Sequence, residues 1–283
     1  QDGLFRYNTD DYKLFNMRAK GAVQVFDWLK VEDNLEYSSM TYHNPLNVGE
    51  GGGIWRNIAD EGHILAPMFN PDGTLTHSAA YTVGDFWYGK NGIDTEQRIL
   101  KNTVSTTASF LKDKLRIKGD FTFQNNDQTQ IRVPVPFSRR PGVIEYVGSS
   151  KNDIQNTNKT TSYLASNIYG EYEDTFKEVH YFKAMVGYNY EESRMKNVKV
   201  LRNGLIFDDA EDLNMALGQT INTEGGYSKW RISGGFFRLN YVFNDRYLLE
   251  VNGRLDGSSK FPSDSQYAFF PSVSAGWRVS QEP

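Results

Sequence analysis

The chain has 283 residues, a formal net charge of −4 and no cysteine. Without cysteine it can form neither a disulfide framework nor a thiolate metal site, and its mild acidity gives no reason to expect a nucleic-acid partner. Its mean hydropathy is low, at −0.59, and no stretch approaches the roughly 18 apolar residues of a membrane helix. These properties exclude a helical membrane protein but leave open a β-barrel, whose strands are only half apolar.

Nine strands are predicted in chain order, from runs in which polar and apolar side chains alternate. Their approximate ranges are 11–25, 29–42, 97–110, 114–127, 158–173, 177–192, 229–243, 246–258 and 268–280. These runs exceed the 5–6 residues that are common in soluble sheets, and a tilted membrane strand needs about 9–11 residues. Tight turns alternate with long connections over roughly 43–96, 128–157, 193–228 and 258–267. We therefore predict an all-β, antiparallel transmembrane β-barrel with long extracellular loops.

The tight turns share one short pattern, in which an aromatic residue is followed within a few positions by an acidic and a basic residue. The four copies lie at 26–30, 110–115, 172–177 and 243–247. Amphipathic rings at strand ends suit a membrane–water boundary. Because short turns of outer-membrane barrels face the periplasm, strand 11–25 is predicted to run inward and strand 29–42 outward.

Strand 114–124 separates two faces cleanly, because successive side chains of a strand point to opposite sides. Leu115, Phe121 and Phe123 share one face, which is predicted to contact lipid, while charged and amide side chains share the other. The same alternation in other strands places a set of polar side chains in a hydrated barrel interior. The predicted interior residues are Arg18, Lys20, Lys114, Arg116, Lys118, Asp120, Glu250, Asn252, Arg254 and Asp256.

Such alternation is also typical of half-buried strands in a soluble β-sandwich, so the soluble alternative stays open. Strand length and the series of charges on the polar faces favour the barrel. Asp33 falls on the apolar side of its strand, and the alternation shifts near Gly234 and Gly235, where a β-bulge is expected. Nine is an odd number, whereas bacterial single-chain barrels use even numbers. Nine strands therefore predict an arc of a larger barrel.

Two further segments carry local predictions. Residues 208–217 begin with acidic residues and carry Leu213 and Leu217, which predicts a short helix inside a long loop. The chain begins at Gln1 without the basic and apolar regions of a secretory signal. Because an outer-membrane protein needs such a signal, we expect a mature or truncated chain.

The last 55 or so residues carry a long, ordered set of motifs. They are FRLNY at 237–241, DRYL at 245–248, RLDGSSKF at 254–261 and FPSVSAGWR at 270–278. This block closely resembles the SusC/RagA family of TonB-linked outer-membrane transporters. Looser matches at 15–18, 70–74 and 187–191 extend the resemblance over the chain.

The resemblance implies a bacterial outer-membrane barrel of about 22 strands closed by an internal plug domain. It implies import of oligosaccharide or peptide nutrients, energised by TonB, beneath a SusD-like surface lipoprotein that acts as a lid, with a dimer of transporter–lid pairs as one possible assembly. Residues 1–283 would then be the central part of one barrel domain, without the plug, the TonB-binding segment or the terminal strands. Most predicted interior residues would anchor the plug through salt bridges, and simple hydration of the interior is the alternative. A passive porin and a soluble secreted β-rich glycan-binding protein remain the alternative functions.

Enzyme signatures are scarce, and neither a catalytic residue nor a metal or cofactor site is predicted. The histidines at 43, 63, 77 and 180 follow no metal-binding spacing. Residues 49–53 are glycine-rich but lack the Lys-Ser/Thr of a phosphate-binding loop, which predicts a flexible loop. Glu250 and Asp256 share a face but lie roughly 20 Å apart along their strand, beyond the about 5–9.5 Å of paired glycosidase carboxylates.

Aromatic residues of the first long loop are the candidates for contact with substrate or lid. They are Trp55, Tyr81, Phe86, Trp87 and Tyr88. Flat rings with polar edges stack on sugars and pack against partner proteins. The alternative is that these rings fold the large loop on itself, and both interpretations stay open.

Overall fold

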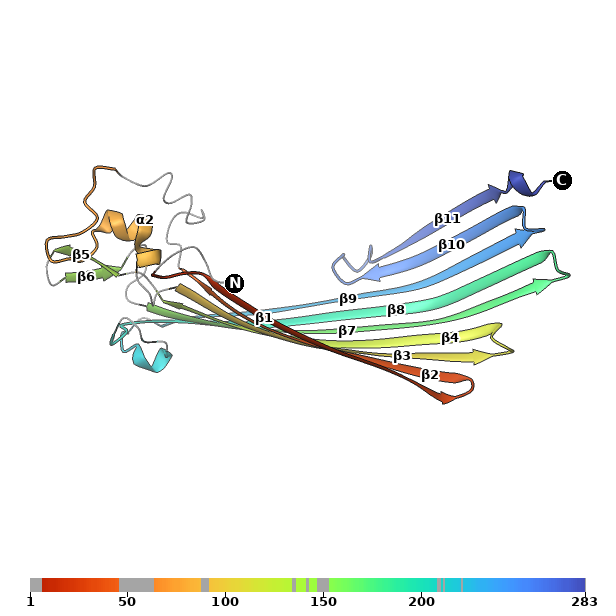
Figure 1. Cartoon of the computed structure of the whole chain (residues 1–283), viewed down its shortest axis with the longest axis horizontal. Coiled ribbons are helices and arrows are strands. Elements are labelled where there is room, and N and C mark those ends of the chain that lie inside the picture. Colours follow the sequence, from red (N-terminus) through yellow and green to blue (C-terminus); the bar gives the residue numbers. More distant parts are fainter. Residues whose placement is uncertain are drawn as a thin grey trace.

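A computed structural model of the chain describes residues 7–45, 64–87, 92–133, 136–140, 143–146, 153–207, 210, 212–219 and 221–282. One long, curved sheet dominates the described part (Figure 1). Within it, nine strands pair in the order β1-β2-β3-β4-β7-β8-β9-β10-β11, and every neighbouring pair is antiparallel. The predicted number and arrangement of strands is confirmed.

The strands follow the predicted ranges closely at one end and extend beyond them at the other. They are β1 (Asp11–Phe26), β2 (Leu29–Asn44), β3 (Gly92–Phe110), β4 (Leu115–Val133), β7 (Asp153–Phe176), β8 (His180–Asn203), β9 (Ile221–Phe243), β10 (Tyr247–Ser258) and β11 (Tyr267–Trp277). In the described part of the chain β1 and β11 each pair on one side only, so the sheet is open. An open sheet is what an arc of a larger barrel requires.

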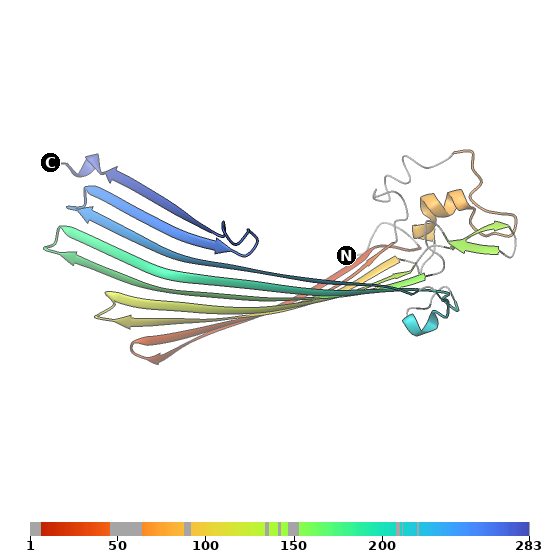
Figure 2. The same ribbon diagram turned by 180° about the vertical axis from the view of Figure 1, so that it is seen from behind.

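All four tight turns lie together at one end of the sheet, called here the turn end. The described parts of the connections from β2 to β3, from β4 to β7 and from β8 to β9 lie at the opposite, loop end, whereas the connection between the shorter strands β10 and β11 lies partway along the sheet (Figure 1). Both views show this separation, with the C-terminus at the turn end (Figures 1 and 2). Lys177 and Glu178 in one turn, and Asn244 and Asp245 in another, adopt positive φ values of 48–62°. Positive φ at two central residues gives the hairpin turn whose twist matches that of the strands.

Strands reach 24 residues in β7 and β8, so the predicted loop 193–228 is wrong over much of its length. Residues 193–203 continue β8, and 221–228 begin β9. Near the turn end one face of each strand is apolar and the other polar, whereas toward the loop end both faces are polar. Alternation therefore disappears from the sequence while the backbone pairing continues.

The predicted β-bulge at Gly234 and Gly235 is also wrong. β9 pairs with β8 without a register shift from Ile221 to Phe243, and with β10 from Ile232 to Phe243. The continuous register places Trp230 and Ile232 on the polar side of the sheet. The shift of alternation in the sequence reflects two apolar residues on the polar face, not an extra residue in the strand.

Small elements gather at the loop end. Helix α2 (His77–Trp87) begins where the Thr76 hydroxyl accepts a hydrogen bond from the Ala79 amide (3.3 Å), and it lies beside β5 (Pro136–Arg140), which pairs with β6 (Val143–Tyr146). The predicted helix at 208–217 is reduced to one 3-10 turn, η1 (Leu213–Met215), and η2 (Val279–Gln281) follows β11 at the turn end. No helix of the described residues is long and apolar enough to span a membrane.

The buried apolar residues of the described part lie toward the loop end, away from the turns. Ile154, Leu205, Ala210 and Ala216 form one small cluster, in which the loop carrying η1 folds back against β7. Leu75, Ala79 and Ala80 are buried around α2. Near the turn end, no second layer of described residues covers either face of the sheet, so this region lacks the core that a soluble domain requires.

Candidate functional site

The sheet presents two chemically different faces near the turn end. The outer face carries Leu115 and Phe121, and the inner face carries Arg116 and Lys118. Because a tilted membrane strand needs about 9–11 residues, we take the first such stretch from each turn as the membrane segment. On β8 it ends near Tyr190, and on β9 it ends near Ser233.

The outer face of the membrane segments is an apolar belt. Its larger members include Phe15, Met17, Val23, Leu35, Val104, Ile117, Phe121, Phe123, Ile168, Phe182, Val186, Leu239, Leu249, Val251, Leu255, Phe269 and Val273. Phe121 is 47% and Leu249 is 45% exposed. An uncovered apolar surface of this extent suits hydrocarbon and not water. The belt therefore agrees with the predicted lipid contact.

An aromatic girdle borders the belt at the turn end. Trp28 stacks between Phe26 and Phe110, with ring centroids 5.6 Å apart on each side. On the neighbouring turns, His180 packs 5.1 Å from Phe243. Rings with polar edges are enriched at membrane–water interfaces. The aromatic residues of the repeated turn pattern are thus the residues that form this girdle.

At the outer edge of the girdle, Glu282 joins side chains of β10 and β11. Its carboxylate accepts hydrogen bonds from Trp277 Nε1 (3.0 Å) and from the Tyr247 hydroxyl (2.8 Å), and it pairs with Arg246 (3.2 Å). The hydrogen bond from Trp277, followed by that from Tyr247, lowers the pKa of Glu282. One ionised carboxylate therefore attaches the segment after β11 to the side chains at the turn end of β10 and β11.

Asp33 is the polar exception in the belt. It faces outward, as the sequence pattern predicted, and its carboxylate accepts a hydrogen bond from Asn102 Nδ2 of β3 (2.7 Å). Gly21 lies opposite Asp33 on β1. The pair Asp33–Asn102 therefore makes a small polar notch in an otherwise apolar surface.

The inner face near the turns holds a compact ion-pair network across β4, β7 and β8. Glu171 contacts Arg116 at 2.7 Å, Lys118 at 3.0 Å and Lys183 at 3.5 Å, and its side chain is only 8% exposed. Glu173 pairs with Arg116 at 2.9 Å and with Lys183 at 3.3 Å. Three cations thus share two carboxylates, which ties three strands together on the polar wall.

A second polar group lies on β9 and β10. Arg254 contacts Asp256 at 2.6 Å and donates to Asn189 Oδ1 of β8 at 2.8 Å. Asn252 accepts from Arg238 at 2.8 Å and donates to Glu250 at 2.7 Å. The predicted interior residues of β10 are therefore joined in short local contacts, and Arg254 pairs with Asp256 and not with Glu250.

Of the remaining predicted interior residues, Arg18, Lys20 and Asp120 lie elsewhere on the same inner wall, whereas Lys114 does not lie on it. On β1, Arg18 contacts Asn34 at 2.7 Å and Glu36 at 3.3 Å, and Lys20 shares its face. Asp120 accepts from Asn167 at 3.1 Å. Lys114 lies in a turn and pairs with Asp174 at 2.7 Å. Nine of the ten predicted residues are thus distributed along the wall, and the ten do not converge on one site.

Sequence reasoning missed both carboxylates and one cation of the main network. Glu171, Glu173 and Lys183 fall inside predicted strands but were not singled out. Alternation offered a signal, because Glu171 and Glu173 are two residues apart and therefore point to the same side of β7. In the paired sheet this is the side that carries the cations Arg116 and Lys118 of β4. The register that joins them cannot be read from one strand alone.

The loop aromatics are only partly described. Trp55 and Tyr88 lie outside the described residues, and Tyr81 and Phe86 lie in α2. Trp87 packs against Tyr7 (5.1 Å between centroids) and Phe69 (5.2 Å). These contacts show that at least this ring helps fold the loop end.

The histidines also separate in the structure. His43 lies on β2 beyond the membrane segment, where Nδ1 contacts Asp94 (2.7 Å) and Nε2 contacts Asn8 (2.8 Å); the contact with Asp94 raises the pKa of His43. His180 belongs to the girdle, and His63 lies outside the described residues. Among the residues with assigned positions, no group of three His, Asp or Glu side chains could hold a metal ion.

Comparison with known proteins gives sequence relatives along the whole chain, although no protein-family model matches it. The TonB-dependent receptor P26 of Formosa agariphila is 26% identical over 294 aligned residues, covering 100% of this chain and 28% of the receptor. The TonB-dependent receptor SusC of Bacteroides thetaiotaomicron is 45% identical over 47 residues, or 17% of this chain and 5% of SusC. The chain therefore spans about a quarter of the length of the first of these relatives.

Solved structures share the fold. The RagAB peptide importer in its closed-closed state aligns over 100% of this chain and 32% of the compared chain, with a TM-score of 0.71 and 18% identity. Its open-open state covers 97% of this chain with a TM-score of 0.70. The sequence relatives and the shared fold confirm the predicted resemblance: this chain is similar to part of the barrel of TonB-dependent receptors of the SusC/RagA type, which are bacterial outer-membrane proteins.

Proposed function

We propose that the chain forms a central part of the barrel of a TonB-dependent importer that carries oligosaccharides or peptides across the bacterial outer membrane. In this proposal residues 1–283 lie within one barrel domain, and the plug, the TonB-binding segment and the terminal strands belong to the rest of the protein. The observation that supports it best is a single-layer sheet with an uncovered apolar belt outside and a charged wall inside, in a chain related to TonB-dependent receptors.

The proposed partners follow from the same relatives. A SusD-like surface lipoprotein would cover the loop end, and TonB would act from the periplasmic, turn end. RagAB is named a peptide importer, and SusC is named a TonB-dependent receptor. The name of RagAB supports peptide as the substrate class, while oligosaccharide and a dimer of transporter–lid pairs enter the proposal from the family resemblance.

In this proposal the inner wall is the polar surface that the plug domain contacts. In the proposal Arg18, Lys20, Asp120 and the residues of β10 anchor the plug or hydrate the barrel interior. The Glu171 network stabilises the wall itself. The loop aromatics, Trp87 among them, contact substrate or lid in this proposal.

Import of this kind needs no covalent step, since substrate passes when the plug rearranges. A passive porin would share the belt and the polar wall but would conduct without an energy source. A soluble glycan-binding protein is disfavoured, because the described sheet leaves its apolar belt without a covering layer.

The test compares uptake with and without TonB in a host that carries the full-length protein. Cells receive defined mixtures of oligosaccharides or of peptides as the sole nutrient, and mass spectrometry follows depletion of each compound. We expect depletion of one class to require both this protein and TonB. Uptake that persists after deletion of TonB would establish a porin instead.

The partner is tested separately by purification of the full-length protein from its native membrane. A surface lipoprotein encoded beside it should copurify in roughly equal amount. Purification without any lipoprotein would remove the lid from the proposal, while TonB-dependent uptake would still stand.

A further inference from the structure

A group of cations lies on the outer face of β8 and β9, immediately beyond the membrane segments. Arg194 lies opposite Lys229, Glu192 opposite Arg231, and Lys196 opposite Tyr227. All six residues continue the side of the strands that carries the apolar belt, so they point away from the barrel interior. This group, called here the outer cation cluster, is Arg194, Lys196, Lys229 and Arg231.

One carboxylate organises the cluster. Glu192 contacts Arg194 Nε, Arg231 Nε (2.5 Å) and Lys229 Nζ (3.4 Å), and it accepts a hydrogen bond from the Tyr190 hydroxyl (2.9 Å). The Arg231 hydrogen bond, above all, lowers the pKa of Glu192 to about 2, so this group stays ionised. Three cations around one anion leave a net positive charge at neutral pH.

Arg194 and Arg231 use only one guanidinium nitrogen each, Nε, to contact Glu192. Their side chains remain 55% and 52% exposed. The remaining guanidinium donors lie in the planar fork that matches phosphate oxygens. Lys196 adds a cation for which the described residues provide no carboxylate partner within 4.0 Å.

Other strands do not cancel this charge locally. At the same level the outer face of β7 carries Leu164, Ser162 and Thr160, which are uncharged. Asp127 of β4 lies on that face, but it is in register with Thr160 and therefore two strands away from Lys196. Positive charge is therefore concentrated on β8 and β9.

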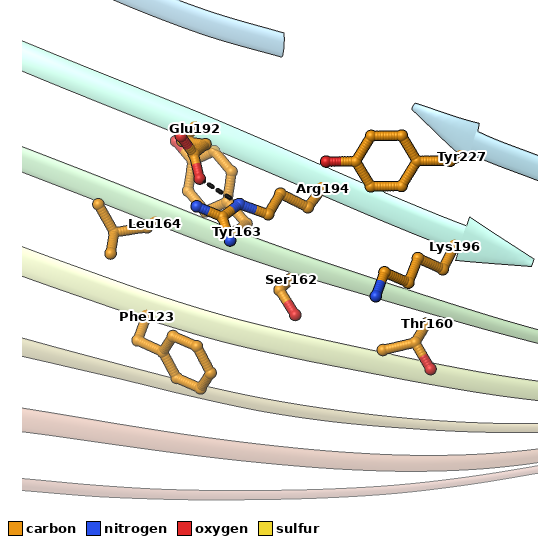
Figure 3. A pocket seen from close by; sticks show the side chains of 9 residues that line it. All are labelled: Phe123, Thr160, Ser162, Tyr163, Leu164, Glu192, Arg194, Lys196 and Tyr227. Atoms are coloured by element: carbon orange, nitrogen blue, oxygen red, sulfur yellow. Dashed lines mark hydrogen bonds and ion pairs between the residues drawn. The ribbon is translucent and has the colours of Figure 1, made fainter. Parts of the chain in front are cut away.

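A shallow groove of about 550 Å³ lies beside the cluster. Arg194, Lys196 and Tyr227 line it on the polar side, and Phe123 and Leu164 line it toward the belt (Figure 3). Ser162 lies between the two parts, and Thr160 lies opposite Lys196 (Figure 3). A cationic rim above an apolar floor fits a molecule that carries a phosphate on an acyl body.

We propose that the outer cation cluster binds the phosphate of an anionic lipid in the outer leaflet of the membrane. Arg194, Lys229 and Arg231 would hold the phosphate, Lys196 would add charge, and acyl chains would pass over Leu164 and Phe123 into the belt. The position favours a lipid as the ligand over a soluble substrate, because the cluster faces away from the barrel interior. The inference rests on the orientation of the sheet, with the turn end in the periplasm, and not on import.

Lipid binding is measured on the full-length protein in nanodiscs of phosphatidylcholine that contain either monophosphorylated lipid A or its dephosphorylated form. Native mass spectrometry counts the retained lipid. We expect selective retention of the phosphorylated lipid, and a roughly tenfold or larger loss in the double variant Arg194→Gln/Lys229→Gln. The matched control is Lys199→Gln, which removes one cation from the inner face of β8, where Lys199 pairs with Glu224.

Three outcomes would overturn the proposal. They are equal retention of the two lipids, undiminished retention in the double variant, and displacement by millimolar inorganic phosphate as effective as by lipid, which would indicate an adventitious anion only. If the double variant does not fold, Lys196→Gln serves instead, because this side chain has no carboxylate partner among the described residues to lose. A reduction of retention to about one third is then expected, with unchanged uptake of nutrient, so that failure of this site and failure of the import proposal are distinguishable.

Discussion

At the scale of single residues, the polar wall is organised by carboxylates that each serve several cations. Glu171 is the clearest case, since its almost buried side chain contacts Arg116, Lys118 and Lys183. An exposed ion pair contributes little, whereas charge-assisted hydrogen bonds to a shielded carboxylate contribute more. The stability of the wall therefore depends on a few anions and not on the number of charges.

Replacement of Glu171 by Gln should destabilise the barrel by about 1–3 kcal/mol, because three cations lose their shared anion while remaining close together. Urea unfolding, followed by heat-dependent mobility on gels, measures the change. The matched control is Glu96→Gln, since Glu96 is exposed and its one ion pair with a described residue is to Arg98 at 3.4 Å. Equal midpoints for the two variants would show that the network contributes nothing to stability.

A turn residue offers a gain of stability instead. Glu178 has a φ of 62°, a region that costs an L-residue about 1–2 kcal/mol and costs glycine little. Glu178→Gly should therefore stabilise the barrel by about 0.5–1 kcal/mol. Asp27→Gly in the first turn is the control, because Asp27 is not among the residues with positive φ. A loss of stability at position 178 would contradict the turn geometry.

At the scale of elements, the segment after β11 is fastened to the girdle by Glu282. Because the folded-state pKa of Glu282 lies below its ordinary value of 4.5, its contribution to stability is complete above that value. The contribution is lost as pH falls through the lower, folded-state pKa. The contacts with Trp277 and Tyr247 should therefore loosen in acid, below about pH 4.5.

This pH dependence is visible by fluorine NMR of 5-fluorotryptophan, with the Trp277 resonance assigned through Trp277→Phe. The resonance should shift reversibly between pH 5 and the acid limit in the wild type and remain constant in Glu282→Gln, which cannot ionise. The expected pH range follows from the lowered pKa. An identical titration in the variant would assign the transition to another group.

The strands show which parts of the fold the sequence could predict. Within the membrane segments, lipid on one side and water on the other impose strict alternation, so β10 and the turn end of β4 were located to within one residue. Beyond the belt both faces meet polar surroundings, and the continued pairing of β7 with β8 leaves no trace in hydropathy. The loop-end helix α2 and the pair β5–β6 were also missed, inside connections that were predicted as loops.

The candidate site follows the same rule. The side of a strand on which a charge lies could be predicted, because parity alone decides it, and nine of the ten predicted interior residues lie on one face of the sheet. Lys114, in a turn, pairs instead with Asp174 on the outer side. Their partners could not, because Arg116 meets Glu171 only through the register between β4 and β7. The outer cation cluster was missed because Arg194 and Lys196 fell in the predicted loop 193–228, so that their pairing with the start of strand 229–243 was not foreseen.

At the scale of the whole molecule, the sheet is stable only if its two faces meet different surroundings. The belt leaves Phe121, Leu249 and Phe269 uncovered, and these side chains lie in a single layer without a protein core behind them. In water such a surface would associate or aggregate. Membrane insertion is thus a condition of the fold, and it can be tested at one position on the outer face.

Phe121 lies near the middle of the membrane segment of β4 and is 47% exposed on the outer face. Arginine there should cost about 2–4 kcal/mol, the cost of placing its charge near the middle of the bilayer. The fraction of folded protein recovered in outer membranes, measured by heat-dependent mobility, should fall severalfold. Val198→Arg is the control, because Val198 shares the outer face of the sheet, is 54% exposed and lies beyond the membrane segment. Equal recovery of both variants would show that lipid does not contact Phe121, and the membrane orientation of the sheet, on which the phosphate site also rests, would be wrong.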